Sequence, residues 1–171
     1  MSGGWLAVVG TGPDGPEWLT PETTDILEQA TDLVGYGPYL DRVAAGHQRR
    51  HAADTRQDLA RAGHALDMAA DGARVAVLSA GGAGGIAAAA AVLEALDRDS
   101  EGRWDHVAVT VHPGVSAMQA AAARLGAPLG GDFCAISLSD NLKPLAVVER
   151  RVRLAAEAEL VMALYNPASR A

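Results

Sequence analysis

Short apolar segments alternate with helical segments along the chain, and this order limits the possible folds more than any single motif does. Segments typical of buried strands lie at residues 5–9, 33–36, 74–78, 107–111, 133–138 and 160–165. Segments typical of helices lie at residues 20–30, 38–43, 54–70, 86–96, 116–125 and 144–158. Strands that alternate with helices predict an α/β fold, with a parallel sheet covered by helices.

The length of 171 residues suits one large domain or two small ones. We expect two α/β domains: an N-terminal domain at residues 1–112, and a linker with a partial C-terminal domain at residues 113–171. The partial domain holds one βαβ unit, which leaves two open sheet edges and little core. We therefore expect that a partner chain covers this region, or that the chain is a shortened form of a longer protein.

Composition excludes several classes of function. The formal net charge of −7 argues against non-specific binding to nucleic acid. No apolar run reaches the roughly 20 residues that span a bilayer, and residues 1–10 lack the pattern of a signal peptide. A cytoplasmic protein with no membrane partner is expected by default. The single cysteine, Cys134, lies in a predicted strand, forms no internal disulfide and is expected to be buried.

The first predicted strand ends in a glycine-rich loop, residues 10–15, that matches the dinucleotide pattern G-x-G-x-x-G. That pattern needs a helix that opens within the glycines, whereas Pro13 and Pro16 interrupt the turn and the helix begins only near Thr20. The acidic residue Asp32 also precedes the second predicted strand instead of ending it. We interpret the loop either as a wide turn against a ligand or as a tight surface loop.

Two further loops follow predicted strands. Residues 79–85 form a second glycine-rich loop, which lacks the Gly-Lys-Ser/Thr ending of a phosphate-binding P-loop. Pro113 and Gly114 form a turn after the strand at residues 107–111, beside His112, for which we expect a structural role. Ligands in α/β sheets bind at the carboxyl ends of strands. The three loops therefore predict a binding cleft.

Basic and histidine residues give weaker signals. A basic cluster in this acidic chain is expected mainly to be a solvated surface, with contact to an anionic substrate as the alternative; it comprises Arg49, Arg50, His51 and Arg56. His47 and His51 are four residues apart, but Gly46 and the lack of a third ligand argue against zinc. We predict no metal site.

Several segments together resemble the tetrapyrrole (corrin/porphyrin) methylases. The general motifs are GTGP with EWLT at residues 10–13 and 17–20, and PGVSA at residues 113–117. The more specific ones are GYGPYL at 35–40, LGAPL at 125–129, DFCAISLSD at 132–140 and ALYNP at 163–167. The specific motifs are similar to the branch of the family that methylates C17 of a precorrin, with ring contraction, in cobalamin biosynthesis.

The resemblance implies two α/β domains with S-adenosylmethionine in the cleft between them, a tetrapyrrole substrate with several carboxylates, and a homodimer. It implies a cofactor site at Gly12, Pro13, Gly81, Gly82, Ala83, Gly84, Ile86, Ser116, Ala117, Leu164, Tyr165 and Asn166. It implies substrate contacts at Tyr36, Tyr39 and Ser137. It assigns no catalytic residue, since methyl transfer from a sulfonium mainly needs alignment and exclusion of water.

The chain departs from the family pattern in two loops. Gly82 stands where relatives usually have an acidic residue, and Asp14-Gly15 stands where they usually read Gly-Asp. Two alternatives therefore stay open beside the methyltransferase. One is a truncated or degenerate homologue with weak or no catalysis, and the other is a methylase of the same family with another acceptor.

Overall fold

The computed structural model describes residues 3–52, 58–81, 88–139 and 143–166. The chain forms two compact units, Met1–Ala117 and Met118–Ala171, each of which is described by itself. Among the described residues, no helix is both long and apolar enough to cross a membrane.

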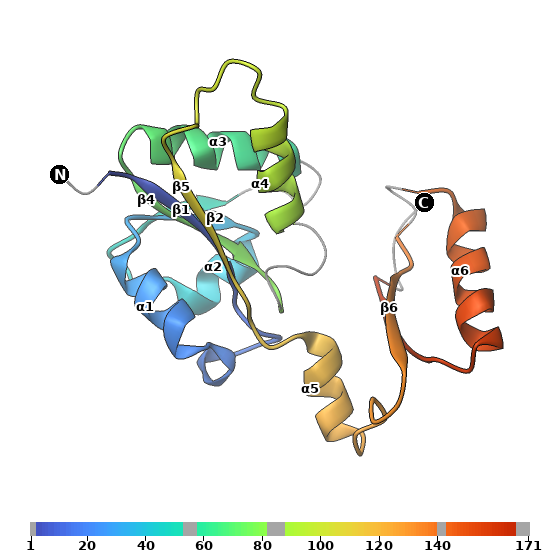
Figure 1. Cartoon of the computed structure of the whole chain (residues 1–171). Coiled ribbons are helices and arrows are strands. Elements are labelled where there is room, and N and C mark those ends of the chain that lie inside the picture. Colours follow the sequence, from blue (N-terminus) through green and yellow to red (C-terminus); the bar gives the residue numbers. More distant parts are fainter. Residues whose placement is uncertain (1–2, 53–57, 82–87, 140–142, 167–171) are drawn as a thin grey trace. The chain divides into compact units, whose positions relative to one another are not determined.

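The first unit is built on a five-stranded parallel sheet with the strand order β3-β2-β4-β1-β5 (Figure 1). Its strands are β1 (Trp5–Gly10), β2 (Asp32–Gly35), β3 (Arg49–Ala52), β4 (Arg74–Ser79) and β5 (Ala108–His112). In the register of the sheet, Gly10 pairs with Ser79, and Val9 pairs with His112. The carboxyl ends of β1, β4 and β5 therefore meet at one edge, which we call the carboxyl edge.

Helices cover both faces of this sheet. They are α1 (Pro21–Gln29), α2 (Gly37–Val43), α3 (Asp58–Ala70) and α4 (Ala88–Asp97). In Figure 1, α1 and α2 lie on one face and α3 and α4 on the other. Alternate residues of β1 serve the two faces: Leu6 and Val8 join the cluster under α3 and α4, and Ala7 and Val9 join the cluster under α1 and α2. Strands buried on both faces have the continuous apolar runs seen in the sequence.

The start of α1 follows from local capping. The Thr20 side chain accepts a hydrogen bond from the Thr23 N–H at 3.1 Å, and Pro21 occupies the first turn. A short 3-10 turn at Pro16–Trp18 separates β1 from α1, so no helix opens within residues 10–15. This geometry confirms the rejection of a dinucleotide-binding loop. The expected start of α3, residues 54–57 of the segment predicted at 54–70, lies outside the described residues.

Two details of the first unit correct the expectations from sequence. Residues 49–52 form β3, a strand that the sequence did not predict. It is an edge strand with polar, largely exposed side chains, so it has neither the apolar run nor the alternation by which strands are recognised. Asp32 is the first residue of β2, whereas the sequence placed it before the strand.

The second unit contains a parallel pair of strands and the helix that connects them. Its elements are α5 (Ala117–Arg124), which begins at the boundary, β6 (Phe133–Ser137), α6 (Leu145–Glu157) and β7 (Val161–Tyr165). This is the βαβ unit predicted from the sequence. Cys134 is only partly buried, because it lies on a strand of a two-stranded sheet with few covering elements. The alternation of strands and helices in both units confirms the α/β fold class.

Candidate functional site at the carboxyl edge of the sheet

The loops that follow β1 and β4 are joined through their backbones. The Thr11 N–H donates to the Ser79 carbonyl at 2.9 Å, and the Thr11 hydroxyl donates to the same oxygen at 3.1 Å. Gly12 and Gly81 form an antiparallel bridge, in which the Gly81 N–H donates to the Gly12 carbonyl at 3.0 Å. Both glycines have a positive φ, +75° and +67°, which side chains disfavour.

The turn after β5 packs against the same two loops. A β-carbon at Gly10 would lie 2.5 Å from the Gly114 nitrogen and 2.5 Å from the Gly81 oxygen. A β-carbon at Gly114 would lie 2.5 Å from the Gly81 oxygen and 2.6 Å from the Gly10 oxygen. Only glycine therefore allows these three backbones to meet, and the three loops of the predicted cleft converge at the carboxyl edge.

Part of the predicted cofactor site is brought together in this way. A β-carbon at Gly81 would lie 3.5 Å from the Ala117 nitrogen and 3.6 Å from the Ser116 Cα, so the loop after β4 is in contact distance of the last two residues of the first unit. Gly12 is bridged to Gly81, and Pro13 follows it in the chain. The remaining predicted residues of the loop after β4 lie outside the described residues; they are Gly82, Ala83, Gly84 and Ile86.

The other predicted contacts lie in the second unit, at the carboxyl ends of β6 and β7. Ser137 pairs with Tyr165 in the register of the two strands, and the Asn166 side-chain amide donates to the Ser137 hydroxyl at 3.1 Å. The Tyr165 hydroxyl accepts from the Met118 N–H at 3.2 Å. Leu164 precedes Tyr165 and is exposed. Ser137 and Asn166, predicted to contact different ligands, thus form one cluster.

Tyr36 and Tyr39 lie at the start of α2, where the chain leaves β2. Their rings meet edge to face, with centroids 5.4 Å apart. The Arg42 guanidinium lies 5.7 Å from the centre of the Tyr39 ring, and its Nε lies 3.8 Å from an Asp14 oxygen. Sequence reasoning missed Arg42; the signal was its position three residues after Tyr39 on a helix, which places both on one side.

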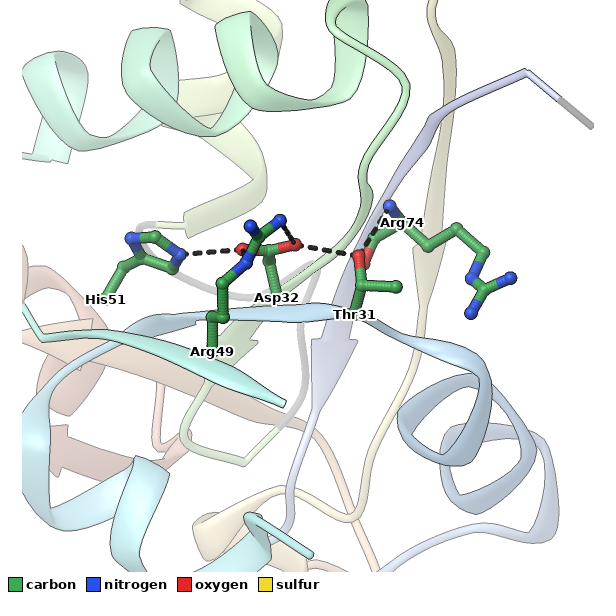
Figure 2. Close-up of polar contacts among 5 residues, drawn as sticks. All are labelled: Thr31, Asp32, Arg49, His51 and Arg74. Atoms are coloured by element: carbon green, nitrogen blue, oxygen red, sulfur yellow. Dashed lines mark hydrogen bonds and ion pairs between the residues drawn. The ribbon is translucent and has the colours of Figure 1, made fainter. Parts of the chain in front are cut away.

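The basic cluster is bound to a buried carboxylate. Figure 2 shows Arg49, His51 and Thr31 directed at Asp32, whose side chain is 1% exposed. Arg49 donates through Nε and Nη2, at 2.9 Å each, and the Thr31 hydroxyl donates at 2.7 Å. His51 Nε2 lies 2.8 Å from Asp32 Oδ1, and it donates because an ionised carboxylate only accepts.

These contacts set the charge of Asp32. Burial raises the pKa of Asp32, but the hydrogen bonds from Arg49, Thr31 and His51 outweigh it and bring the pKa from 3.8 to about 2. The cluster braces β3 against β2, and Thr31 continues the network by accepting from the Arg74 N–H at 3.0 Å (Figure 2).

A cavity of about 510 Å³ adjoins this network, at the amino ends of β2 and β4, opposite the glycine loops. It is lined by Thr31, Asp32, Arg49, His51, Met68, Asp71, Gly72 and Ala73. Its basic residues are engaged by Asp32, and Arg50 is paired with Asp41 of α2. The geometry supports a structural role for these described members of the cluster; Arg56 lies outside the described residues.

His112 also has a structural arrangement. Its Nδ1 lies 2.9 Å from a Glu22 oxygen, and its Nε2 lies 2.8 Å from the Thr110 hydroxyl. These contacts connect the end of β5 to the first turn of α1. The side chain thus holds the strand that leads into the Pro113 turn.

Comparisons with known proteins agree with the fold and with the motifs. Residues 6–171 match the family model of the tetrapyrrole (corrin/porphyrin) methylases. The chain is 54% identical over 169 residues to a precorrin-3B C(17)-methyltransferase of a Sinorhizobium species, covering 98% of this chain and 66% of that protein. It is 49% identical over 167 residues to the cobalamin biosynthesis protein CobIJ of Mycobacterium tuberculosis, covering 97% of this chain and 32% of that protein.

A solved structure agrees with these relatives. The crystal structure of the methyltransferase CobJ superimposes with a TM-score of 0.91 at 49% identity, over 97% of this chain and 69% of that one. The chain spans less than two thirds of the length of the Sinorhizobium and Mycobacterium relatives. The family match over nearly all of its residues, the fold and the loop motifs lead to one conclusion: the chain belongs to the tetrapyrrole (corrin/porphyrin) methylase family.

Proposed function

We propose that this chain is part of an S-adenosylmethionine-dependent C-methyltransferase that methylates a precorrin at C17, with ring contraction, in cobalamin biosynthesis. The observation that carries the proposal is the convergence of the loops after β1, β4 and β5 in a member of the methylase family. The identity of 54% to a relative named for this reaction supports the choice of acceptor.

The residues present fit the cofactor. The loops at the carboxyl edge bring together backbone N–H and carbonyl groups, and the close approach of Gly10, Gly81 and Gly114 leaves no side chain between them. Such a backbone surface suits the polar methionine and ribose groups of S-adenosylmethionine. When bound, the cofactor supplies an electrophilic methyl group on a sulfonium.

The chain's own residues would hold and orient the two reactants. Gly12, Pro13, Gly81, Ser116 and Ala117 are proposed to hold the methionine and ribose parts. The adenine side is proposed to meet Leu164, Tyr165 and Asn166, and the loop after β4 to contribute Gly82, Ala83, Gly84 and Ile86. Alignment of the methyl group with the acceptor carbon and exclusion of water are the main demands of this displacement.

The substrate is proposed to contact Tyr36, Tyr39 and Ser137. The two tyrosines offer aromatic surface for the macrocycle and hydroxyls for its carboxylates.

We also expect a cytoplasmic homodimer, as the family resemblance implies. Sedimentation of the purified chain tests the dimer.

Titration of the chain with S-adenosylhomocysteine by calorimetry tests the cofactor site. We expect a dissociation constant in the micromolar range, followed by transfer of a labelled methyl group to a precorrin. The absence of heat, from a chain that circular dichroism shows to be folded, would reject catalysis and favour the degenerate homologue, for which Gly82 is the motivating residue.

A methylase of the same family that acts on another acceptor remains the second candidate function. Contraction of the ring changes the conjugated system, so methylation at C17 should change the absorption spectrum of the tetrapyrrole. Methyl transfer without a spectral change would favour an enzyme that acts on a different position or a different tetrapyrrole.

A further inference from the structure

We propose that Arg42 binds a carboxylate of the tetrapyrrole substrate by exchanging its contact with Asp14, beside an aromatic surface formed by Tyr36 and Tyr39. The inference rests on the proposed function, because it takes a tetrapyrrole with carboxylate arms as the ligand. It adds a residue that neither the sequence motifs nor the family comparison assigns.

The position of α2 places these side chains at the carboxyl edge of the sheet. Tyr36 follows the last residue of β2, Gly35, and precedes α2. A β-carbon at Gly35 would lie 3.1 Å from the Leu78 Cβ, next to the last residue of β4. Asp14 belongs to the loop after β1. The pair of Arg42 and Asp14 thus joins α2 to one of the three converging loops.

The contact between Arg42 and Asp14 is of a kind that a ligand can replace. It is a single contact of 3.8 Å, and the two side chains are 39% and 79% exposed. Exposed ion pairs of this kind contribute little to stability, so another carboxylate can take the place of Asp14 at little cost. A guanidinium also binds carboxylates with two parallel hydrogen bonds, which this pair does not use.

Aromatic contacts hold Arg42 in place while it exchanges partners. Its guanidinium lies 5.7 Å from the centre of the Tyr39 ring, within the range of a cation–π contact. Tyr39 packs partly against the core cluster, which fixes the ring. Tyr36, which is 40% exposed and edge to face with Tyr39, adds apolar surface beside the cation. An aromatic surface next to a guanidinium matches a macrocycle with a carboxylate arm.

The neighbouring arginines are held differently. Arg49 makes two hydrogen bonds to Asp32. If Arg49 left Asp32 to bind a ligand, the buried carboxylate would lose its main partner. Arg50 is in an exposed pair with Asp41, with side chains 45% and 67% exposed. The exchangeable contact of Arg42 therefore distinguishes it from Arg49, and among the described residues the cation–π contact with Tyr39 distinguishes it from Arg50.

The test is a fluorescence titration of the 171-residue chain with uroporphyrin, a stable tetrapyrrole with a carboxylate on every side chain. The variants are Arg42→Ala, Arg42→Lys and Asp14→Asn, with Arg98→Ala as the matched control. Arg98, the residue after α4, is also an exposed arginine in an ion pair, with Glu94 of that helix. A porphyrin with pyridinium arms in place of carboxylates is titrated in parallel.

We expect Arg42→Ala to weaken uroporphyrin binding about tenfold, and Arg42→Lys to weaken it less. Asp14→Asn should strengthen binding about threefold, because it removes the competing carboxylate. Arg98→Ala should change it by less than about twofold. The pyridinium porphyrin should not bind more weakly to Arg42→Ala than to the unchanged chain.

Equal effects of Arg42→Ala and Arg98→Ala would overturn the proposal, since only net charge would then matter. Loss of S-adenosylhomocysteine binding in Arg42→Ala would also overturn it, because the variant would have disturbed the loops. If the unchanged chain binds uroporphyrin through Arg42 but does not bind S-adenosylhomocysteine, the carboxylate site stands and the proposed methyltransferase function fails.

Discussion

At the scale of single residues, Asp32, the first residue of β2, links this strand to β3 and, through Thr31, to the start of β4. It accepts hydrogen bonds from Arg49 and His51 of β3 and from Thr31, which also accepts from the Arg74 N–H. Because its pKa is about 2 in the folded chain and 3.8 when unperturbed, the folded state favours the ionised form. The contribution to stability is fully present above pH 3.8 and is lost as the pH falls through about 2.

Replacement of this carboxylate should therefore have an effect that depends on pH. We expect Asp32→Asn to lower the free energy of unfolding by about 2 kcal/mol at neutral pH, the value that the difference in pKa implies. The gap between the unchanged chain and the variant should close as the pH approaches 2. Urea unfolding followed by circular dichroism over this range measures it, and a gap that stays constant down to low pH would contradict the assigned pKa.

The glycines at the carboxyl edge provide a second test at this scale. Gly114→Ala would place a methyl group 2.5 Å from the Gly81 carbonyl oxygen, so the ends of β4 and β5 must separate. We expect a loss of about 1–3 kcal/mol in stability and of more than about tenfold in S-adenosylhomocysteine affinity. Gly37→Ala is the matched control, because its β-carbon meets no atom within 4 Å.

The control should keep its affinity and most of its stability, since the added methyl group meets open space. If Gly114→Ala binds S-adenosylhomocysteine as well as Gly37→Ala does, then the meeting of the three loops is not needed for the cofactor.

At the scale of elements, the start of α1 depends on one side chain. Thr20 accepts from the Thr23 N–H, and the buried Thr23 hydroxyl lies 3.5 Å from the Gly10 carbonyl at the end of β1. We expect Thr20→Ala to lower the free energy of unfolding by about 1 kcal/mol through loss of the cap. Thermal unfolding measures the change.

Thr24→Ala serves as its control. The Thr24 hydroxyl donates only to the Thr20 carbonyl one turn back, a contact that does not stabilise helices, and alanine is the better helix former. We expect this variant to be unchanged or slightly more stable. An equal loss in both variants would show that the helix, and not its cap, responds to the substitution.

At the scale of the whole molecule, the two units differ in how much core they contain. The first unit has an apolar cluster on each face of a five-stranded sheet. The second unit has two strands and leaves several large apolar side chains exposed, namely Leu125, Phe133, Leu145, Leu154 and Leu164. A two-stranded sheet has little independent stability.

We therefore expect the two units of this chain to open with different free energies. Amide hydrogen exchange followed by mass spectrometry should show slow exchange in β1 and β4 and much faster exchange in β6 and β7. A dye that binds exposed apolar surface should bind to the chain, and its binding should fall when Leu145 and Leu154 are both changed to serine. Equal protection of the four strands would show that the second unit is stabilised as strongly as the first.

The sequence by itself determined the local elements and the family. Each of these features depends on neighbouring residues and could be predicted without the fold: the runs at residues 5–9 and 74–78, the helix start near Thr20, the loops after the strands and the methylase motifs. The rejection of a dinucleotide site rested on the prolines of one loop and was confirmed. The proposed cofactor contacts stay predictions.

Only the tertiary structure decided which of these parts meet. The strand order β3-β2-β4-β1-β5 brings Gly10, Gly81 and Gly114 into contact although they lie far apart in the chain. It also pairs the polar residues of β3 with β2 and turns a basic segment into the partner of Asp32. Local patterns specify helices and strands, but sheet order and side-chain partners depend on long-range packing, which no short segment contains.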